Sequence, residues 1–82
     1  MNNSNIDAVA KILVDIMINI EEIRIVEGQL VVTFFDKYGG MNAAYETIPE
    51  ENDALTRGLF AQKILNKIMN ETHPAYLSNQ AQ

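Results

Sequence analysis

Two runs rich in β-branched and aromatic residues flank the dipeptide Glu27-Gly28, and this arrangement predicts a β-hairpin. Glycine reaches a positive φ without a steric penalty from a Cβ atom, so a tight turn fits at this point. Because side chains alternate along a strand, the turn places five apolar side chains on one face of the hairpin: Ile23, Ile25, Leu30, Val32 and Phe34. The hairpin therefore supplies an apolar sheet face that other elements must cover.

A third strand is predicted at 43–48, after a cluster of turn-forming residues at 36–40. Framed by a helix on each side, these strands predict an α+β fold of two layers. Its sheet has three antiparallel strands, a β-meander, and the element order is α-β-β-β-α. A chain of 82 residues is long enough for one modest core. We expect a single domain over 1–74 and a polar, mobile C-terminal tail over 75–82.

The segment before the hairpin is predicted to form an amphipathic helix from about residue 6 to 21, with Ser4 or Asn5 as its N-cap. Apolar residues recur at helical spacing along its main stripe, which should cover the sheet. Ile12, Val14 and Ile18 lie outside that stripe. They either pack against the other helix or the sheet edge, or form a self-association or partner surface.

The second helix is predicted to begin after Pro49, where Thr47 and Glu50 have the spacing of a capping box and Asn52 is a competing N-cap. Its inward face is expected to comprise Ala54, Gly58, Ala61, Ile64, Leu65 and Ile68. Glycine inside a helix costs about 1 kcal/mol relative to alanine. Its presence at position 58 therefore predicts tight packing against another element.

Further apolar residues of the second helix, Leu59 and Phe60 among them, fall outside its predicted inward face. They join Ile12, Val14 and Ile18 as the candidate self-association residues. Both helices could thus contribute to one extra interface, which would make the protein a homodimer.

The net charge of −5, from eleven acidic and six basic residues, disfavours direct nucleic-acid binding because an acidic surface repels phosphates. A basic protein, or one that itself binds nucleic acid, is the favoured partner. The lack of cysteine excludes disulfides, thiolate zinc sites and cysteine nucleophiles. Neither a signal peptide nor a membrane span is predicted, so we expect a cytoplasmic protein without a membrane partner.

No catalytic or metal signature is visible in the sequence. His73 is the single histidine and has no second nitrogen or sulfur ligand to complete a zinc site. Ser4 and Ser78 both lie near the chain ends, where a serine nucleophile has no rigid platform. We therefore predict that the protein is not an enzyme and uses no cofactor or metal.

An acidic cluster is formed by four carboxylates within eight residues: Glu46, Glu50, Glu51 and Asp53. Their spacing lacks the alternating ligands and the central glycine of a calcium loop. One interpretation is solvated charge that complements the positive end of the second helix. The other, which we adopt as the prediction, is that the cluster contacts a basic surface on a partner protein.

These features predict a non-catalytic, small acidic protein that regulates or inhibits a partner by occupying its surface. The alternative is a homodimeric structural or assembly subunit. No family is recognised by motif. In element order, size and charge, the chain is similar to several phage-encoded inhibitors of bacterial defence or transcription, such as some anti-CRISPR proteins. This likeness is one of class, covers no specific residues and assigns no site.

Overall fold

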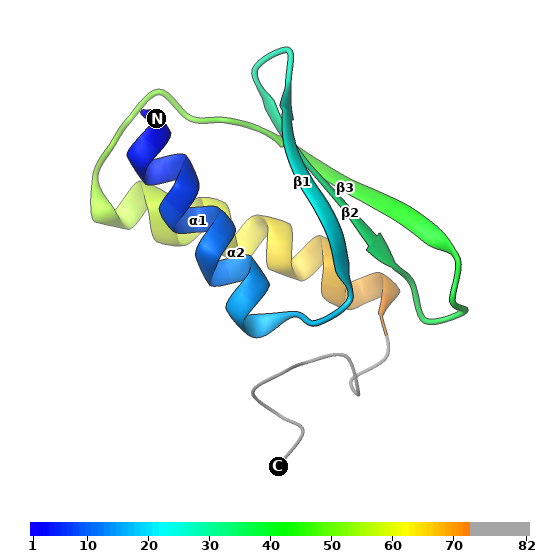
Figure 1. Ribbon diagram of the computed structural model, residues 1–82. Helices are drawn as coiled ribbons and strands as arrows, with labels where there is room; N and C mark the ends of the chain where they lie inside the picture. The colour runs from blue at the N-terminus through cyan, green and yellow to red at the C-terminus, as the bar shows by residue number, and fades with distance from the viewer. Residues whose placement is uncertain (73–82) are drawn as a thin grey trace.

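The computed structural model describes residues 1–72, which form an α+β fold of two layers (Figure 1). Its elements are α1 (Asn3–Ile16), β1 (Ile20–Val26), β2 (Gln29–Phe35), β3 (Met41–Thr47) and α2 (Ala54–Glu71). The strands form one antiparallel sheet in the order β1-β2-β3, and both helices lie on the same side of it. The predicted fold class is confirmed. The predicted tail over 75–82 lies outside the described residues.

The predicted turn at Glu27-Gly28 is confirmed as a two-residue connection. Val26 pairs with Gln29 across the hairpin, and the two residues between them have φ values of 49° and 78°. Two consecutive positive φ values are typical of the type I′ turn, whose twist matches that of the flanking strands. Glu27 is thus a residue with a Cβ atom held in a conformation that suits glycine or asparagine better.

The predicted apolar face of the hairpin is also confirmed, since Ile23 lies opposite Val32 and Ile25 opposite Leu30. The tip of the hairpin extends past both helices in Figure 1. Ile25 consequently remains 53% exposed although it is on the inner face of the sheet.

The predicted bounds of the first helix are wrong at both ends. Its N-cap is Asn2, whose side-chain oxygen accepts a hydrogen bond from the Asn5 backbone N–H at 2.9 Å, so neither Ser4 nor Asn5 is the cap. The helix ends at Ile16 because the chain then turns into the sheet. There the Asn19 carbonyl accepts from the Phe35 N–H at 3.0 Å, and the Asn19 side chain donates to the Phe35 carbonyl at 2.7 Å.

The second helix also begins later than predicted, because Asp53 is its N-cap. The Asp53 carboxylate accepts from the Thr56 backbone N–H at 2.7 Å, and the capping box predicted from Thr47 does not form, since Thr47 ends β3. Asn52 has a different role. Its side-chain oxygen accepts from the backbone N–H of Asn2 at 2.6 Å and so ties the start of α1 to the loop before α2.

The core lies between the two helices and the inner face of the sheet. Its buried members are Ile6, Val9, Leu13, Met17, Leu30, Val32, Phe34, Ala44, Phe60, Ala61, Ile64, Leu65 and Ile68. The inward stripe of α2 thus includes Phe60, which is one turn before Ile64, whereas Ala54 and Gly58 are exposed. A Cβ atom built at Gly58 would meet nothing within 4 Å. The prediction of tight packing at Gly58 is therefore wrong.

Candidate functional site

The four carboxylates of the predicted acidic cluster have different environments in the structure. Glu46 lies in β3 and forms an ion pair with Lys67 of α2 at 2.7 Å. Asp53 caps α2, and Glu50 and Glu51 are exposed in the connection between β3 and α2. Two of the four carboxylates, Glu46 and Asp53, thus have local partners in the fold, whereas Glu50, Glu51 and Asp53 are exposed to solvent.

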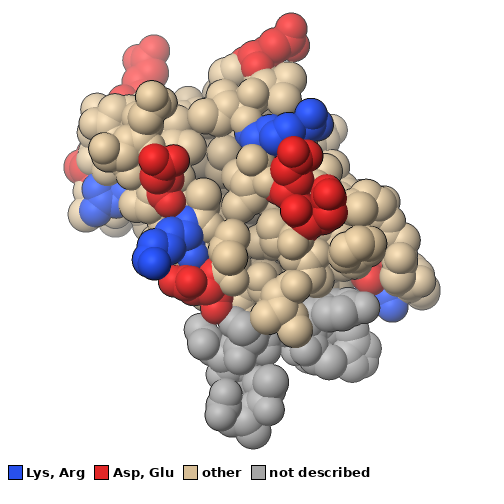
Figure 2. All heavy atoms as spheres, in the orientation of Figure 1, with Lys and Arg blue, Asp and Glu red and all other residues tan. Residues whose placement is uncertain are grey.

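Both carboxylates of the cluster that have local partners are held in the ionised form. The hydrogen bond from Lys67 lowers the pKa of Glu46, and the charges of Lys67 and Lys63 lower it further, against an opposing effect of desolvation. Hydrogen bonds from Thr56 lower the pKa of Asp53, and the charge of Arg57 adds to this. In agreement with such pairing, Figure 2 shows acidic and basic side chains interspersed over the face in view.

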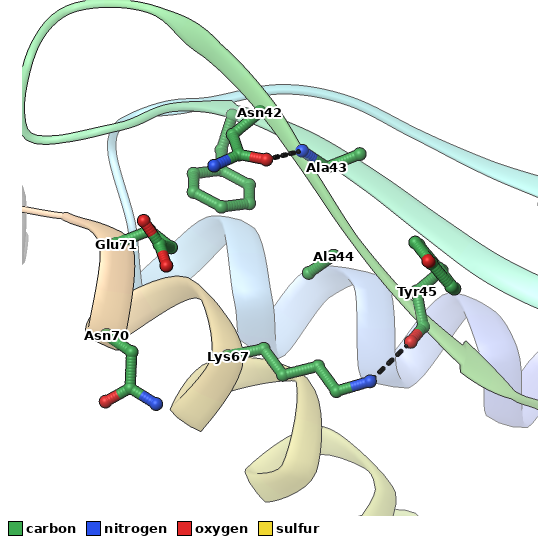
Figure 3. A pocket seen from close by; sticks show the side chains of 8 residues that line it. Asn42, Ala43, Ala44, Tyr45, Lys67, Asn70 and Glu71 are labelled. Atoms are coloured by element: carbon green, nitrogen blue, oxygen red, sulfur yellow. Dashed lines mark hydrogen bonds between the residues drawn. The ribbon is translucent and has the colours of Figure 1, made fainter.

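A groove runs between β3 and α2 and contains two cavities. β3 is at an end of the strand order, so among the described residues it pairs only with β2. One cavity, of about 340 Å³, is seen in Figure 3; the residues that line it include Phe34, Asn42, Tyr45, Lys67, Asn70 and Glu71. The other, of about 240 Å³, is lined by residues that include Glu46, Thr47, Pro49, Leu59 and Lys63. Both cavities thus lie along the outer edge of β3.

Two backbone groups of β3 in this groove form hydrogen bonds with side chains. The Lys67 Nζ atom donates to the Tyr45 carbonyl at 2.7 Å, as well as pairing with Glu46. The Asn42 side-chain oxygen accepts from the Ala43 N–H at 2.8 Å (Figure 3). Side-chain bonds of this kind satisfy groups that an edge strand would otherwise offer to another chain.

The candidate self-association residues have different environments. Ile12, Val14, Ile18 and Leu59 are exposed, with Ile18 the most exposed of the first three at 63%. Phe60 is only 4% exposed and belongs to the core, so its assignment to an interface is a mistake. The physical reason is that Phe60 lies four residues before Ile64 and therefore on the same side of α2.

The outer face of the sheet is an apolar surface that sequence reasoning missed. Both helices of residues 1–72 lie on the other face (Figure 1), and Val31 and Phe35 of β2 are directed outward, opposite Tyr45 and Met41 of β3. Residues 29–35 of β2 read Gln-Leu-Val-Val-Thr-Phe-Phe, and the apolar Val31 and Phe35 at outward positions are the signal that could have revealed this surface. A strand covered on one side alone would be expected to alternate with polar residues.

Within residues 1–72, no helix is long and apolar enough to cross a membrane. The same part of the chain contains no group of three or more histidine, aspartate or glutamate side chains that could hold a metal ion. Comparison of the chain with models of protein families, with curated proteins and with solved structures gives no match.

Proposed function

We propose that this protein is a non-catalytic regulator or inhibitor that acts by occupying the surface of a partner protein. The observation that carries the proposal is the outer face of the sheet, which neither described helix covers. Three large side chains there remain open to solvent, Phe35 at 42%, Met41 at 54% and Tyr45 at 56%. Contiguous apolar patches on a small protein commonly mark interaction surfaces, and aromatic side chains dominate the binding energy of such surfaces.

The charge of the chain indicates the kind of partner. A net charge of −5 favours a basic protein, including one that itself binds nucleic acid. Glu50 and Glu51 are exposed and can accelerate association with a basic surface by electrostatic steering. The likeness of class to phage-encoded inhibitors favours a target in the bacterial cytoplasm, and we include that location in the proposal.

Affinity capture from the native host, with variants of defined surfaces, tests this function. We expect the wild type to capture a partner that Phe35→Glu no longer retains, because the substitution places a charge on the apolar outer face, opposite Met41. Met69→Glu is the matched control, since Met69 is 44% exposed, close to the 42% of Phe35, but lies on α2. Capture of no protein, or retention of the partner by Phe35→Glu that is still folded by circular dichroism, contradicts the proposal.

The Glu50→Lys, Glu51→Lys double variant tests the steering. It should associate more slowly with the captured partner at low salt, with little change in melting temperature, because exposed charges contribute little to stability. An association rate that depends on neither salt nor these two residues would assign the acidity to solubility alone.

A homodimeric structural or assembly subunit is the second candidate, favoured by the exposure of Ile12, Val14 and Ile18 on α1 and in the connection to β1. On this proposal, light scattering should detect a dimer at micromolar concentration, and Ile18→Glu should shift it toward monomer while the chain remains folded. A wild-type protein that stays monomeric at high concentration rules this candidate out.

A further inference from the structure

We infer that β3 binds an extended segment of the partner as an additional strand in the groove beside α2, and that this segment places a lysine or arginine side chain at Glu46. The inference rests on the proposed function and gives the partner a specific chemistry. Strand addition of this kind uses main-chain hydrogen bonds for affinity and side-chain pockets for selectivity.

The position of the two cavities is the first step of the argument. Neighbouring strands lie about 4.8 Å apart, so a strand added to β3 would run along its outer edge, beside α2. Both cavities lie on this path, one lined by residues 42–45 of β3 and the other by Glu46 and Thr47. Because side chains of a strand alternate, a guest strand could direct alternate residues into this space.

The hydrogen bonds at the edge are the second step. The Ala43 N–H and the Tyr45 carbonyl are each bonded to a side chain, Asn42 Oδ1 and Lys67 Nζ respectively. A donor and an acceptor two residues apart on an edge strand are the groups through which another strand pairs. The backbone of a guest strand offers a carbonyl to the Ala43 N–H and an N–H to the Tyr45 carbonyl. It can therefore replace both side-chain hydrogen bonds without a net loss of hydrogen bonds.

The negative charge of Glu46 determines which side chain the added strand should carry beside it. A single Nζ atom of Lys67 contacts both the Tyr45 carbonyl and the Glu46 carboxylate, each at 2.7 Å. A guest N–H that takes the carbonyl removes one of the two contacts that hold Lys67 beside Glu46. Two lysines act on Glu46 through their charge, Lys67 and Lys63, and among the described residues Lys67 is the one hydrogen-bonded to it. Loss of that hydrogen bond is unfavourable for a partly buried carboxylate, so a guest lysine or arginine that restores it is favoured over a neutral residue. Lys67 can leave, since its side chain is long and 47% exposed.

A displayed library of random 12-residue peptides, selected on the full-length protein, tests the inference. Selected peptides should be rich in β-formers and carry a lysine or arginine. By fluorescence anisotropy, Glu46→Gln should weaken their binding roughly tenfold, as expected for the loss of about 1.4 kcal/mol. The matched control is Glu22→Gln, because Glu22 is an exposed strand carboxylate that is also paired with a cation, Arg24, at 3.4 Å. It should leave peptide binding unchanged.

The backbone pairing has its own test. Ala43→Pro removes an N–H that bonds only to a side chain, and should abolish peptide binding. N-methylation of a selected peptide at single backbone positions leaves the protein unaltered. It should abolish binding at alternate positions only, and bound peptide should protect the Ala43 and Tyr45 amides from hydrogen exchange. A selection that enriches nothing, binding insensitive to every N-methyl group, or equal loss in Glu22→Gln and Glu46→Gln overturns the inference.

The two proposals fail in different ways. Suppose that a partner is captured through Phe35 but does not protect the amides of β3 and α2 from hydrogen exchange. That result contradicts strand addition in the groove and leaves the proposed function standing. Capture of no partner by the wild type contradicts the proposed function, whatever the peptides do.

Discussion

Gly58 lies inside α2 with its surroundings open, and Gly58→Ala should stabilise the protein. Nothing lies within 4 Å of an added Cβ atom, so the substitution neither gains packing nor creates strain. What remains is the difference in helix propensity, about 1 kcal/mol in favour of alanine. For a domain of this size, 1 kcal/mol corresponds to a rise of about 4–8 °C in melting temperature, which circular dichroism measures directly.

Gly28→Ala is the matched control for this prediction. An added Cβ atom also meets nothing there, but the φ of Gly28 is 78°. Left-handed geometry costs a residue with a Cβ atom about 1–2 kcal/mol, so the same substitution should lower the melting temperature. If Gly58→Ala fails to stabilise while Gly28→Ala destabilises as expected, another surface must pack on Gly58 in solution. That result would refute the reasoning from an exposed α2 face.

Two other predictions concern stability. Glu27→Asn should raise the melting temperature, because asparagine tolerates the φ of 49° better than glutamate does; unchanged or lower stability would show that the turn is not strained. The pKa of Glu46 is lowered in the folded protein, so its pair with Lys67 stabilises the fold above the ordinary glutamate pKa of about 4.3, and this contribution is lost as the pH falls through the lowered value. Wild type should therefore exceed Glu46→Gln in stability at pH 7 by up to about 1 kcal/mol, and urea titrations at pH 7 and at pH 3 should show a smaller difference at the lower pH. A difference independent of pH contradicts the assignment.

The hairpin could be predicted from the sequence because its determinants are local. Gly28 supplies the turn, and the alternation of residues on either side fixes which side chains share a face. The observed pairs Ile23–Val32 and Ile25–Leu30 follow from those two facts alone. The same holds for the element order, which needs only the type of each segment and not its contacts.

The caps and the orientation of α2 could not be predicted because they depend on contacts between distant segments. Asn2 and Asn52 are fifty residues apart, and their hydrogen bond forms only when α1 and the loop before α2 meet. From the sequence, the buried face of α2 could be centred on the side of Gly58 or on the side of Phe60. The packing of α2 against the sheet buries Phe60. The partner of Glu46 could not be predicted for the same reason, since Lys67 is distant from Glu46 in sequence but adjacent in space.

The apolar outer face and the groove meet at Tyr45, whose side chain is exposed on the face and whose carbonyl lines the groove. A strand added to β3 spans at most its seven residues, whereas specific interfaces engage about 20–30 residues on each side. On our proposals, an intact partner must therefore cover the outer face as well, and a free peptide should bind much more weakly than the partner does. Phe35→Glu should then weaken the binding of the intact partner but leave the binding of the peptide unchanged. Ala43→Pro should weaken the binding of both. If Phe35→Glu weakens both equally, the peptide lies on the outer face and not in the groove.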